Sequence, residues 1–407
     1  MRILFICEEY PPGKNGGIGT MVRTLGREMV RQGHQVYVIG LYPHGYGQAA
    51  YEEDQGVKVW RLRYHTDIGV ISNNFSFSDR LLLRMLTFSR LLRLDTFFSV
   101  KRLLRSIRKI VREEGIDIIE MPDWNAFFQP AVGAISVPAF DVPLLVKFNG
   151  SHSYFQKELH LPTNKNVYAS EYALIQRADA LASASRYTAS VTASLFHITR
   201  PIDILYNSID LPPSSPAPDS SSKKIIFTGS LLYKKGIHSL LMAWNTVAEK
   251  HPDAVLEIYG KGDIHKLRLL LKPAIAATVH FKGHVSQESL RAQFAGAVAA
   301  VFPSYSECFA LAPLEAMAAG CAVINTSRAS GKELIDDKEN GLLVDPDAPL
   351  QIADAIILLL EDPLLRDTLA AAGKRTIGER FSIAVSGRYH ITLYEKVIRE
   401  FRLQKGG

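Results

Sequence analysis

Short apolar runs alternate with longer amphipathic stretches along most of the chain. Apolar residues occupy 3–7 and 36–41, an amphipathic stretch from about 20 to 31 lies between them, and Gly33 supplies a helix stop signal. This order predicts a strand, a helix and a second strand. Further apolar runs follow at 116–121, 143–148, 180–184 and 202–206. Such alternation is typical of a parallel sheet covered by helices on both faces.

The alternation is interrupted once, near the middle of the chain. The interruption contains Pro212-Pro213-Ser214-Ser215-Pro216 and three further consecutive serines, a composition typical of a linker. Apolar runs then return at 224–228, 255–259, 279–282, 298–302, 322–325 and 341–344. Because 407 residues are too many for one hydrophobic core, we expect two doubly wound α/β domains. Their predicted bounds are 1–207 and 224–382, with a linker at 208–223.

Composition narrows the class of protein. With 47% apolar and 22% charged residues, the chain resembles an ordinary globular protein. No run reaches the roughly 18 apolar residues that span a bilayer, and the N-terminus lacks a signal-peptide pattern, so we expect a cytoplasmic protein. The three cysteines, Cys7, Cys308 and Cys321, are far apart in the sequence. Their spacing favours neither disulfides nor a zinc site.

The net charge of +6 is modest, but the basic excess is concentrated. The segment from Arg80 to Arg112 holds ten Arg and Lys residues and one acid, Asp95, among many large apolar residues. It forms either a solvated basic helix that buries one apolar stripe or a peripheral attachment to an anionic membrane surface. The sequence does not favour one over the other. Nucleic-acid binding has no supporting motif.

Ligands of open parallel sheets bind beyond the carboxyl ends of the strands, so the loops that follow strands are candidate sites. The first such loop, residues 11–20, brings Gly16 and Gly17 to the start of a helix. Glycines allow close backbone approach, and a helix N-terminus attracts anions. The glycine spacing does not match the dinucleotide fingerprint, which disfavours a dehydrogenase.

A second loop, residues 227–236, places Gly229, Ser230 and Lys235 between a strand and a helix. A lysine there can reach a phosphate that also faces the helix dipole. Taken alone, Lys235 is better explained as part of a solvated lysine pair with Lys234, because exposed lysines are common.

The third loop is the most informative. It runs from 303 to 320 and carries Glu307 and Glu315, eight residues apart. Pro313 suits the first position of a short helix, which would put Glu315 in the first turn and the helix end at Gly320. Carboxylates accept hydrogen bonds from sugar hydroxyls and repel phosphate. Each acid also has a simpler explanation, Glu315 as a complement to the helix dipole and Glu307 as a solvated loop residue.

Together these motifs resemble the retaining GT-B glycosyltransferases of the glycosyltransferase group 1 (family 4) class. The resemblance is carried by Glu307-x7-Glu315, the loop Gly229-Ser230-Leu231-x3-Lys235-Gly236, the pair Gly16-Gly17, and the segment 205–210. It implies two facing Rossmann-like domains with the active site in the cleft. It also implies a C-terminal helix, at about 383–403, that crosses back onto the N-terminal domain.

The resemblance implies a role for each matching residue. Glu307 would contact the donor sugar, Glu315 would bind the ribose, and Lys235 would neutralise the leaving diphosphate. The backbone N–H groups of Phe309, Ala310 and Leu311 would hold the phosphates. Gly17 would lie against them from the N-terminal domain.

The chain departs from the family pattern at three places. Ser230 stands where the family usually has arginine, so one diphosphate cation is missing, and Lys234 is a candidate to replace it. Asn149 stands where many members have histidine, and asparagine cannot exchange a proton. A proton role would then fall to His152 or to the substrates, and His152 is equally well explained as a structural loop residue. Glu333 is retained in a divergent loop, without an assigned role.

The implied reaction transfers a sugar from a nucleotide-sugar to a glycan or lipid-linked acceptor. The acceptor would attack from the face that the diphosphate leaves, and the departing phosphate would help to take the proton. No Asp-x-Asp motif ends a strand, so we expect neither a metal nor a cofactor. The alternatives are a non-catalytic sugar-nucleotide-binding relative and a GT-B sugar-nucleotide epimerase. Assembly of cell-surface polysaccharide or lipopolysaccharide is the setting that the family implies.

Overall fold

The structure, a computed structural model, describes residues 1–12, 16–43, 46, 48–64, 91–128, 135–211 and 223–406. It separates into two compact units. Unit 1 consists of Met1–Ala184, Thr188–Leu205 and Ser386–Gly407, and unit 2 of Ser185–Tyr187 and Tyr206–Val385. Most of the predicted linker, residues 212–222, lies outside the described residues, and Tyr206–Leu211 belongs with unit 2.

Unit 1 is built on an eight-stranded sheet in the order β3-β4-β2-β1-β5-β6-β7-β8. The strands are β1 (Arg2–Ile6), β2 (Gln35–Tyr42), β3 (Tyr51–Asp54), β4 (Val57–Arg63), β5 (Ile118–Pro122), β6 (Leu144–Phe148), β7 (Ala180–Ser183) and β8 (Asp203–Ile204). All neighbours pair in parallel except β3 and β4. The central strands β1, β5 and β6 are apolar and buried because helices cover both faces.

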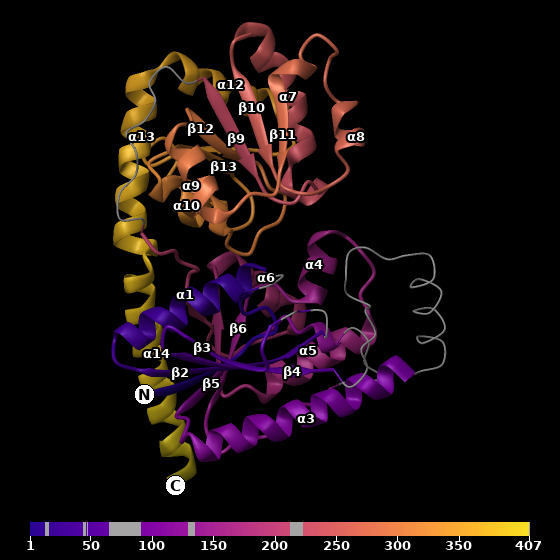
Figure 1. Cartoon of the computed structure of the whole chain (residues 1–407), viewed down its shortest axis with the longest axis vertical. Coiled ribbons are helices and arrows are strands. Elements are labelled where there is room, and N and C mark those ends of the chain that lie inside the picture. Colours follow the sequence, from indigo (N-terminus) through magenta and orange to yellow (C-terminus); the bar gives the residue numbers. More distant parts are fainter. Residues whose placement is uncertain are drawn as a thin grey trace. The chain divides into compact units, whose positions relative to one another are not determined.

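Two helices cover opposite faces of this sheet (Figure 1). Helix α1 (Gly17–Arg31) follows β1, and helix α3 (Leu91–Glu113) makes the crossover that precedes β5. The crossover through α1 leads from β1 to β2, and the crossover through α3 leads in the opposite direction along the sheet, from β4 to β5. Right-handed crossovers in opposite directions place their helices on opposite faces. The remaining helices of the unit are α4 (His152–Glu158), α5 (Lys165–Arg177), most of α6 (Arg186–Phe196) and most of α14 (Ile383–Gly406).

The hairpin of β3 and β4 is absent from the pattern-based prediction. Its two-residue turn, Gln55-Gly56, has positive φ at both residues, 50° and 85°. That geometry matches the right-handed twist of a hairpin and usually selects Asn-Gly or Asp-Gly. Glutamine at the first position removes the usual signal, so this antiparallel edge could not be predicted from the turn residues.

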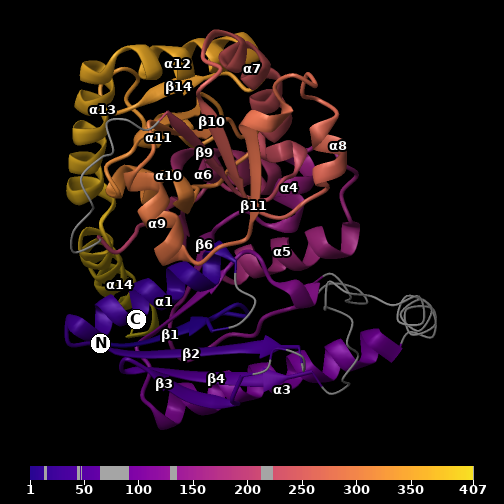
Figure 2. The same cartoon turned by 45° about the horizontal axis from the view of Figure 1, so that its top comes forward.

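Unit 2 contains a six-stranded sheet, parallel throughout, in the order β11-β10-β9-β12-β13-β14 (Figure 2). The strands are β9 (Lys224–Thr228), β10 (Val255–Tyr259), β11 (Val279–Gly283), β12 (Ala299–Phe302), β13 (Ala322–Thr326) and β14 (Leu342–Val344). Numbered from the first strand of the unit, the order is 3-2-1-4-5-6, which is the order of a Rossmann fold. The parallel strands β4-β2-β1-β5-β6-β7 of unit 1 follow the same order, with the antiparallel strand β3 and the short strand β8 added at the edges.

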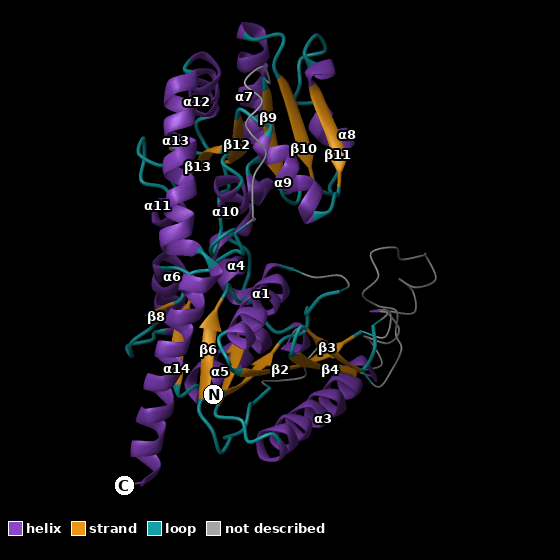
Figure 3. Cartoon of the chain, turned by 60° about the vertical axis from the view of Figure 1, so that its left-hand side comes forward, coloured by secondary structure: helices purple, strands orange, loops and turns teal. Residues whose placement is uncertain are grey.

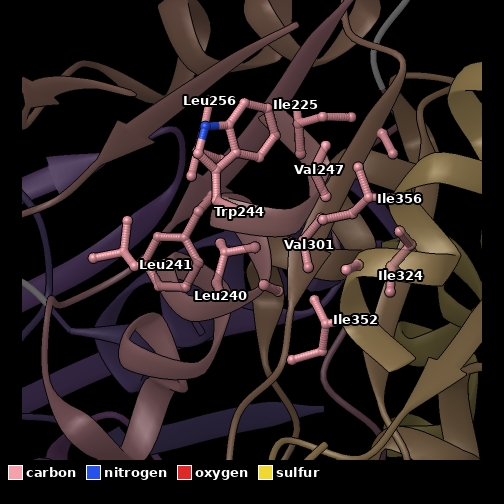
Figure 4. Close-up of a cluster of buried hydrophobic side chains, with 14 of the residues drawn as sticks. Ile225, Leu240, Leu241, Trp244, Val247, Leu256, Val301, Ile324, Ile352 and Ile356 are labelled. Carbon is pink, nitrogen blue, oxygen red and sulfur yellow. The ribbon is translucent and has the colours of Figure 1, made fainter. Parts of the chain in front are cut away.

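Helices cover both faces of the unit 2 sheet. They are α7 (Ile237–Lys250), α8 (Ile264–Arg268), α9 (Gln287–Ala295), α10 (Leu311–Ala318), α11 (Gly331–Leu334), α12 (Pro349–Glu361) and α13 (Pro363–Thr376). The core beneath α7 and α12 centres on Trp244, which is fully buried (Figure 4). Its indole packs with Leu240 and Leu256, and its N–H donates to Thr278 Oγ1 at 2.9 Å. The buried indole is thereby satisfied.

Helix α14 belongs with unit 1 from Ser386 onward (Figure 3). Two buried polar contacts join it to the sheet. The Tyr394 hydroxyl donates to Glu120 Oε2 at 2.5 Å, and His390 Nε2 lies 3.3 Å from Lys147 Nζ. Burial raises the pKa of Glu120 and lowers that of Lys147. In the described part of the chain, no helix is long and apolar enough to cross a bilayer.

Candidate active site

The candidate donor site lies where the strand order of unit 2 reverses. Strands β9 and β12 are neighbours in the sheet, and the connections that follow them lead to opposite sides. The loops beyond their carboxyl ends therefore meet at the point where open α/β sheets bind ligands. The second and third candidate loops of the sequence are these two loops.

A glycine fixes the position of Lys235. After β9 the chain makes a short 3₁₀ turn, Tyr233–Lys235, and Gly236 follows with φ of +70° as the N-cap of α7. A Cβ on Gly236 would lie 1.8 Å from the carbonyl oxygen of Pro303, in the loop after β12. Only glycine allows the two backbones to approach so closely. Lys235 is thus held against the β12 loop.

Lys235 and Glu307 form an ion pair between Nζ and Oε1, across 72 residues of sequence. The hydroxyl of Ser304 donates to the same carboxylate oxygen at 3.1 Å. The side chains of Lys235 and Glu307 are 25% and 16% exposed, so both remain within reach of a ligand. The pairing keeps a carboxylate and an ammonium together at the sheet edge.

Lys234 adds a second cation to this region. Its carbonyl oxygen accepts a hydrogen bond from Tyr305 N at 2.8 Å. Burial lowers the pKa of its ammonium, and the charge of Lys235 lowers it further, whereas Glu307 acts in the opposite direction. Lys234 therefore lies close enough to Lys235 and Glu307 to interact electrostatically with both. Ser230, where the family usually has arginine, is exposed.

Helix α10 begins two residues earlier than predicted. It starts at Leu311, Pro313 is its third residue, and no acid lies in its first turn, so the prediction of Glu315 in that turn was wrong. A proline is tolerated throughout the first turn because its missing N–H would have no intrahelical partner. The N–H groups of Ala310 and Leu311 likewise have no intrahelical acceptor and are available to an anion.

The loop before α10 lines a small pocket with Glu307. Phe309 and Ala310 contribute to its wall, together with Asn325 and Ser330 from the region of β13. The residues predicted to contact the donor sugar and its phosphates thus lie together. The N–H groups of a helix start and a paired carboxylate are presented to the same space.

Glu315, which is partly buried on α10, does not line this pocket. Its carboxylate accepts a hydrogen bond from the side-chain amide of Gln287, at the start of α9. Burial raises its pKa, and the amide together with the charge of Arg291 partly opposes that rise. A carboxylate with a single amide partner retains further acceptor sites for a ribose hydroxyl.

Asn207 is a positioning residue that the sequence analysis did not single out. Its amide Nδ2 donates to the carbonyl oxygen of Phe309 at 3.0 Å. The rings of Tyr206 and Phe381 pack on the Phe309 ring with centroids 5.0 and 5.4 Å away. These contacts fix the peptide that precedes α10. The signal was present, because Asn207 belongs to a segment that carried the resemblance.

Gly229 belongs to a close backbone approach at the end of β9. A Cβ on Gly260, after β10, would lie 1.8 Å from the carbonyl oxygen of Gly229. The Gly229 N–H donates to Tyr259 O at 3.0 Å, and the Gly260 N–H donates to Gly283 O at 2.8 Å. The ends of β9, β10 and β11 are therefore tied by backbone alone, which leaves an edge without protruding side chains.

The first candidate loop lies in unit 1, at the equivalent reversal between β1 and β5. Residues 13–15 of this loop lie outside the described residues. Gly16 is the N-cap of α1 and Gly17 its first residue. The N–H of Gly16 donates to Glu9 Oε2 at 3.2 Å. A carboxylate thus already complements this helix N-terminus, where the sequence predicted a phosphate.

Asn149 and His152 follow β6 in unit 1. The amide of Asn149 donates to the Lys147 carbonyl at 3.2 Å, and its backbone N–H donates to Asp123 Oδ1 at 2.8 Å. The imidazole of His152 stacks on Trp124, with centroids 3.6 Å apart. Burial lowers the pKa of His152 to about 4, so its ring is neutral at pH 7.

Two buried carboxyl groups, in the loops after β1 and β5 of unit 1, were not singled out in the sequence analysis. Glu8 accepts a hydrogen bond from Ala126 N at 2.8 Å, and Asp123 accepts from Asn149 N. In each carboxyl group, the second oxygen is buried without a hydrogen-bond partner among the described residues. Burial raises the pKa of Glu8 to about 8 and that of Asp123 to about 7. Their only sequence signal is that each follows closely after a predicted strand.

Glu333, to which the sequence analysis assigned no role, lies beside the start of α6. The carboxylate of Glu333 accepts hydrogen bonds from the N–H groups of Arg186 and Tyr187, both at 2.8 Å, which gives it a capping role. Within the described ranges, no group of three or more His, Cys, Asp or Glu side chains is arranged to hold a metal ion.

Two family models match consecutive parts of the chain. Residues 15–212 match Glycosyltransferase Family 4, and residues 212–376 match Glycosyl transferases group 1. The chain is also 27% identical to an uncharacterized glycosyltransferase of Methanocaldococcus jannaschii, over 94% of this chain and 95% of that protein. The matches therefore extend across both units.

Solved structures of glycosyltransferases share the fold. Sucrose-phosphate synthase of Thermosynechococcus elongatus superimposes with a TM-score of 0.74 at 18% identity, over 98% of this chain and 99% of that one. HepE of Anabaena, in complex with UDP, superimposes with a TM-score of 0.71 at 15% identity, over 97% of this chain and all of that one. With two Rossmann-like parallel sheets and family matches across both, the chain belongs to the group 1 glycosyltransferases and has the GT-B fold.

Proposed function

We propose that this protein is a retaining, metal-independent hexosyltransferase that uses a nucleoside diphosphate sugar as donor. The observation that carries the proposal is the Lys235–Glu307 ion pair at the reversal of strand order in unit 2, beside the N-terminus of α10. The complex of the structurally similar HepE with UDP supports a nucleoside diphosphate donor. Transfer goes to a hydroxyl of a glycan or lipid-linked acceptor.

The charges at the site match different parts of the donor. The diphosphate binds to the ammonium groups of Lys235 and Lys234 and to the N–H groups of Ala310 and Leu311. Glu307 would repel phosphate, but Lys235 and Ser304 hold its carboxylate, so it accepts a hydrogen bond from the sugar. Glu315 accepts from the ribose. The ammonium of Lys235 has three N–H donors, so it can keep its bond to Glu307 and also donate to the phosphate.

Bond cleavage leaves negative charge on the diphosphate. Lys235 and the helix N-terminus stabilise that charge as it develops, and such preorganised donors are usually the largest single contribution to catalysis. The acceptor hydroxyl attacks from the face that the diphosphate leaves, and the departing phosphate takes its proton. His152, with a pKa of about 4, is too weak a base for this task at neutral pH, and Asn149 cannot exchange protons.

Metal independence follows from the same charges. A divalent cation in nucleotide-sugar chemistry neutralises the diphosphate, and here two lysines and a helix N-terminus supply that positive charge. We therefore expect transfer to continue in the presence of EDTA. A loss of activity with EDTA that Mg²⁺ or Mn²⁺ restores would contradict this part of the proposal.

The proposal is tested with a panel of UDP-, GDP- and ADP-sugars. Binding is measured by thermal stabilisation, turnover by slow donor hydrolysis, and the anomeric configuration of the transferred sugar by NMR. Glu307→Gln and Lys235→Met should abolish or strongly weaken turnover of the preferred donor. The matched controls Glu361→Gln and Lys250→Met alter an exposed ion pair at the far end of α7 and should change nothing.

Each alternative function has its own outcome in this assay. A donor that binds but is neither hydrolysed nor transferred identifies a non-catalytic relative. A donor converted into its epimer, without a transferred sugar, identifies an epimerase. An inverted product would contradict retention while leaving the transferase function intact.

We place the reaction on the cytoplasmic side of a membrane, in the assembly of a cell-surface polysaccharide or lipopolysaccharide. Transfer to a soluble oligosaccharide and to a sugar on a polyprenyl diphosphate carrier in detergent separates the two acceptor classes. If neither acceptor receives the sugar while donor hydrolysis is intact, both acceptor classes are excluded.

A further inference from the structure

Helix α3 has an outward face that the core of unit 1 does not explain. Its inward stripe, Val100, Leu103, Ile107, Ile110 and Val111, is buried in the unit 1 core. These positions recur with helical spacing and account for the stability of the helix. Most residues between them form a second, solvent-facing surface. The Arg80–Arg90 part of the basic segment lies outside the described residues.

The first turns of this outward face carry large apolar side chains. Leu94, Phe97 and Phe98 are 53%, 60% and 52% exposed. The two phenylalanine rings contact each other edge to face, with centroids 5.5 Å apart. Single exposed apolar residues need no explanation, but three in adjacent positions form a contiguous patch, and such patches mark interaction sites.

The same face continues as a basic surface. Lys101, Arg105, Arg108, Lys109 and Arg112 are exposed. Counting from Leu94, the positions 98, 101, 105, 108 and 112 follow at alternating steps of four and three, which keeps them on one side of a helix. The only exposed acid on the described helix is Glu113, which lies 3.8 Å from Lys109. One side of α3 is therefore apolar at its start and strongly positive over the rest of its length.

We propose that this outward face of α3 binds the surface of an anionic lipid bilayer. Leu94, Phe97 and Phe98 enter the boundary between headgroups and acyl chains, and the basic residues lie along the headgroups. A lipid surface uses both halves of the face, since amphipathic surface helices combine buried apolar area with attraction to anionic lipids. A duplex nucleic acid would use only the charges, and a single strand could stack on the phenylalanines but would leave Leu94 exposed. The inference is independent of the proposed sugar transfer, because it concerns a surface outside the donor site.

The test is co-sedimentation of the full chain with vesicles of phosphatidylcholine, with and without phosphatidylglycerol. We expect binding only to the phosphatidylglycerol vesicles, and weaker binding at high salt. The double variants Phe97→Ser/Phe98→Ser and Arg105→Glu/Arg108→Glu should each weaken it by about tenfold or more. All four side chains are exposed, so the variants should fold, which circular dichroism and donor binding verify.

Helix α13 offers matched controls in unit 2. Leu364 is 80% exposed, and Lys374 and Arg375 are an exposed basic pair. Leu364→Ser and Lys374→Glu/Arg375→Glu should leave vesicle binding unchanged. Equal binding to both kinds of vesicle, or equal loss in the α13 variants, would overturn the proposal. So would a change from dimer to monomer in the phenylalanine variant without loss of vesicle binding, since the face would then join two copies of the chain.

Discussion

The two units share one strand order but differ at the reversal of that order. In unit 2, the loops after β9 and β12 bring together Lys235 and Glu307 as a partly exposed ion pair, beside a helix N-terminus with available N–H groups. In unit 1, the corresponding loops hold buried carboxyl groups, and Glu9 already occupies the N-terminus of α1. Topology therefore sets where a ligand binds, and the side chains decide its charge.

The difference predicts a division of labour. We expect the lysines of unit 2 to stabilise a diphosphate, whereas the buried carboxyl groups of unit 1 supply no positive charge for it. A neutral hydroxyl suits the unit 1 loops, because a carboxyl oxygen without a partner can bond to it. We therefore expect the donor to bind to unit 2 and the acceptor to unit 1.

The largest effect is expected from Lys235→Met. The substitution removes the cation that we propose stabilises the leaving diphosphate, and it leaves the Glu307 carboxylate without its ion-pair partner. Loss of one preorganised donor of this kind lowers kcat by about a hundredfold or more. Steady-state kinetics with the preferred donor measure the loss, with Lys250→Met as the control. Wild-type kcat in the Lys235 variant would remove this lysine from the mechanism.

A smaller effect is expected from Asp123→Asn, and it should depend on pH. The folded-state pKa of Asp123 is raised to about 7, so between its unfolded value of 3.8 and pH 7 the folded protein holds a proton that the unfolded chain releases. The free energy of unfolding of the wild type then falls as pH rises through this range, whereas that of the variant does not, because its amide at position 123 binds no proton. The stability of the variant relative to wild type should grow by about 2 kcal/mol from pH 5 to pH 7.

Chemical denaturation at several pH values measures that gap. Asp141→Asn, an exposed position in unit 1, is the control and should show a constant difference from wild type. If the stability of Asp123→Asn relative to wild type decreased as pH rises, the folded protein would stabilise the charged carboxylate of Asp123. The environment of this carboxyl group would then be polar, contrary to the comparison of the two units.

The smallest effect is expected from Asn207→Ala. The substitution removes the hydrogen bond to Phe309 O and loosens the peptide before α10, at a cost of about 1 kcal/mol. We expect KM for the donor to rise by about fivefold, in keeping with that free energy. Asn245→Ala, which removes an equivalent bond to Leu270 O on the far side of α7, should leave KM unchanged. An unchanged KM in the Asn207 variant would show that the loop holds its position without it.

The strands of unit 2 could be predicted closely from the sequence. The run at 224–228 matches β9 and the run at 255–259 matches β10, because each is apolar and bounded by polar or glycine residues. The start of α10 was misplaced because proline is acceptable at several positions of a first turn, so Pro313 did not fix the first residue. Local signals identify an element better than they identify its ends.

The site was predictable as a set of residues but not as an arrangement. Lys235 and Glu307 were both singled out, yet their pairing depends on the adjacency of β9 and β12, which no local pattern encodes. Glu8 and Asp123 were missed because an acid after a strand is ordinarily solvated. Only the packing of neighbouring loops over them makes their carboxyl groups unusual.

Calorimetric titration with UDP measures whether unit 2 alone supplies the charges that bind the nucleoside diphosphate. Wild type, Lys235→Met and Asp123→Asn are titrated under one buffer condition without added metal. We expect Lys235→Met to weaken binding by about tenfold or more, and Asp123→Asn to bind as wild type does. Wild-type affinity in the Lys235 variant, or a loss of affinity in the Asp123 variant, would contradict this expectation.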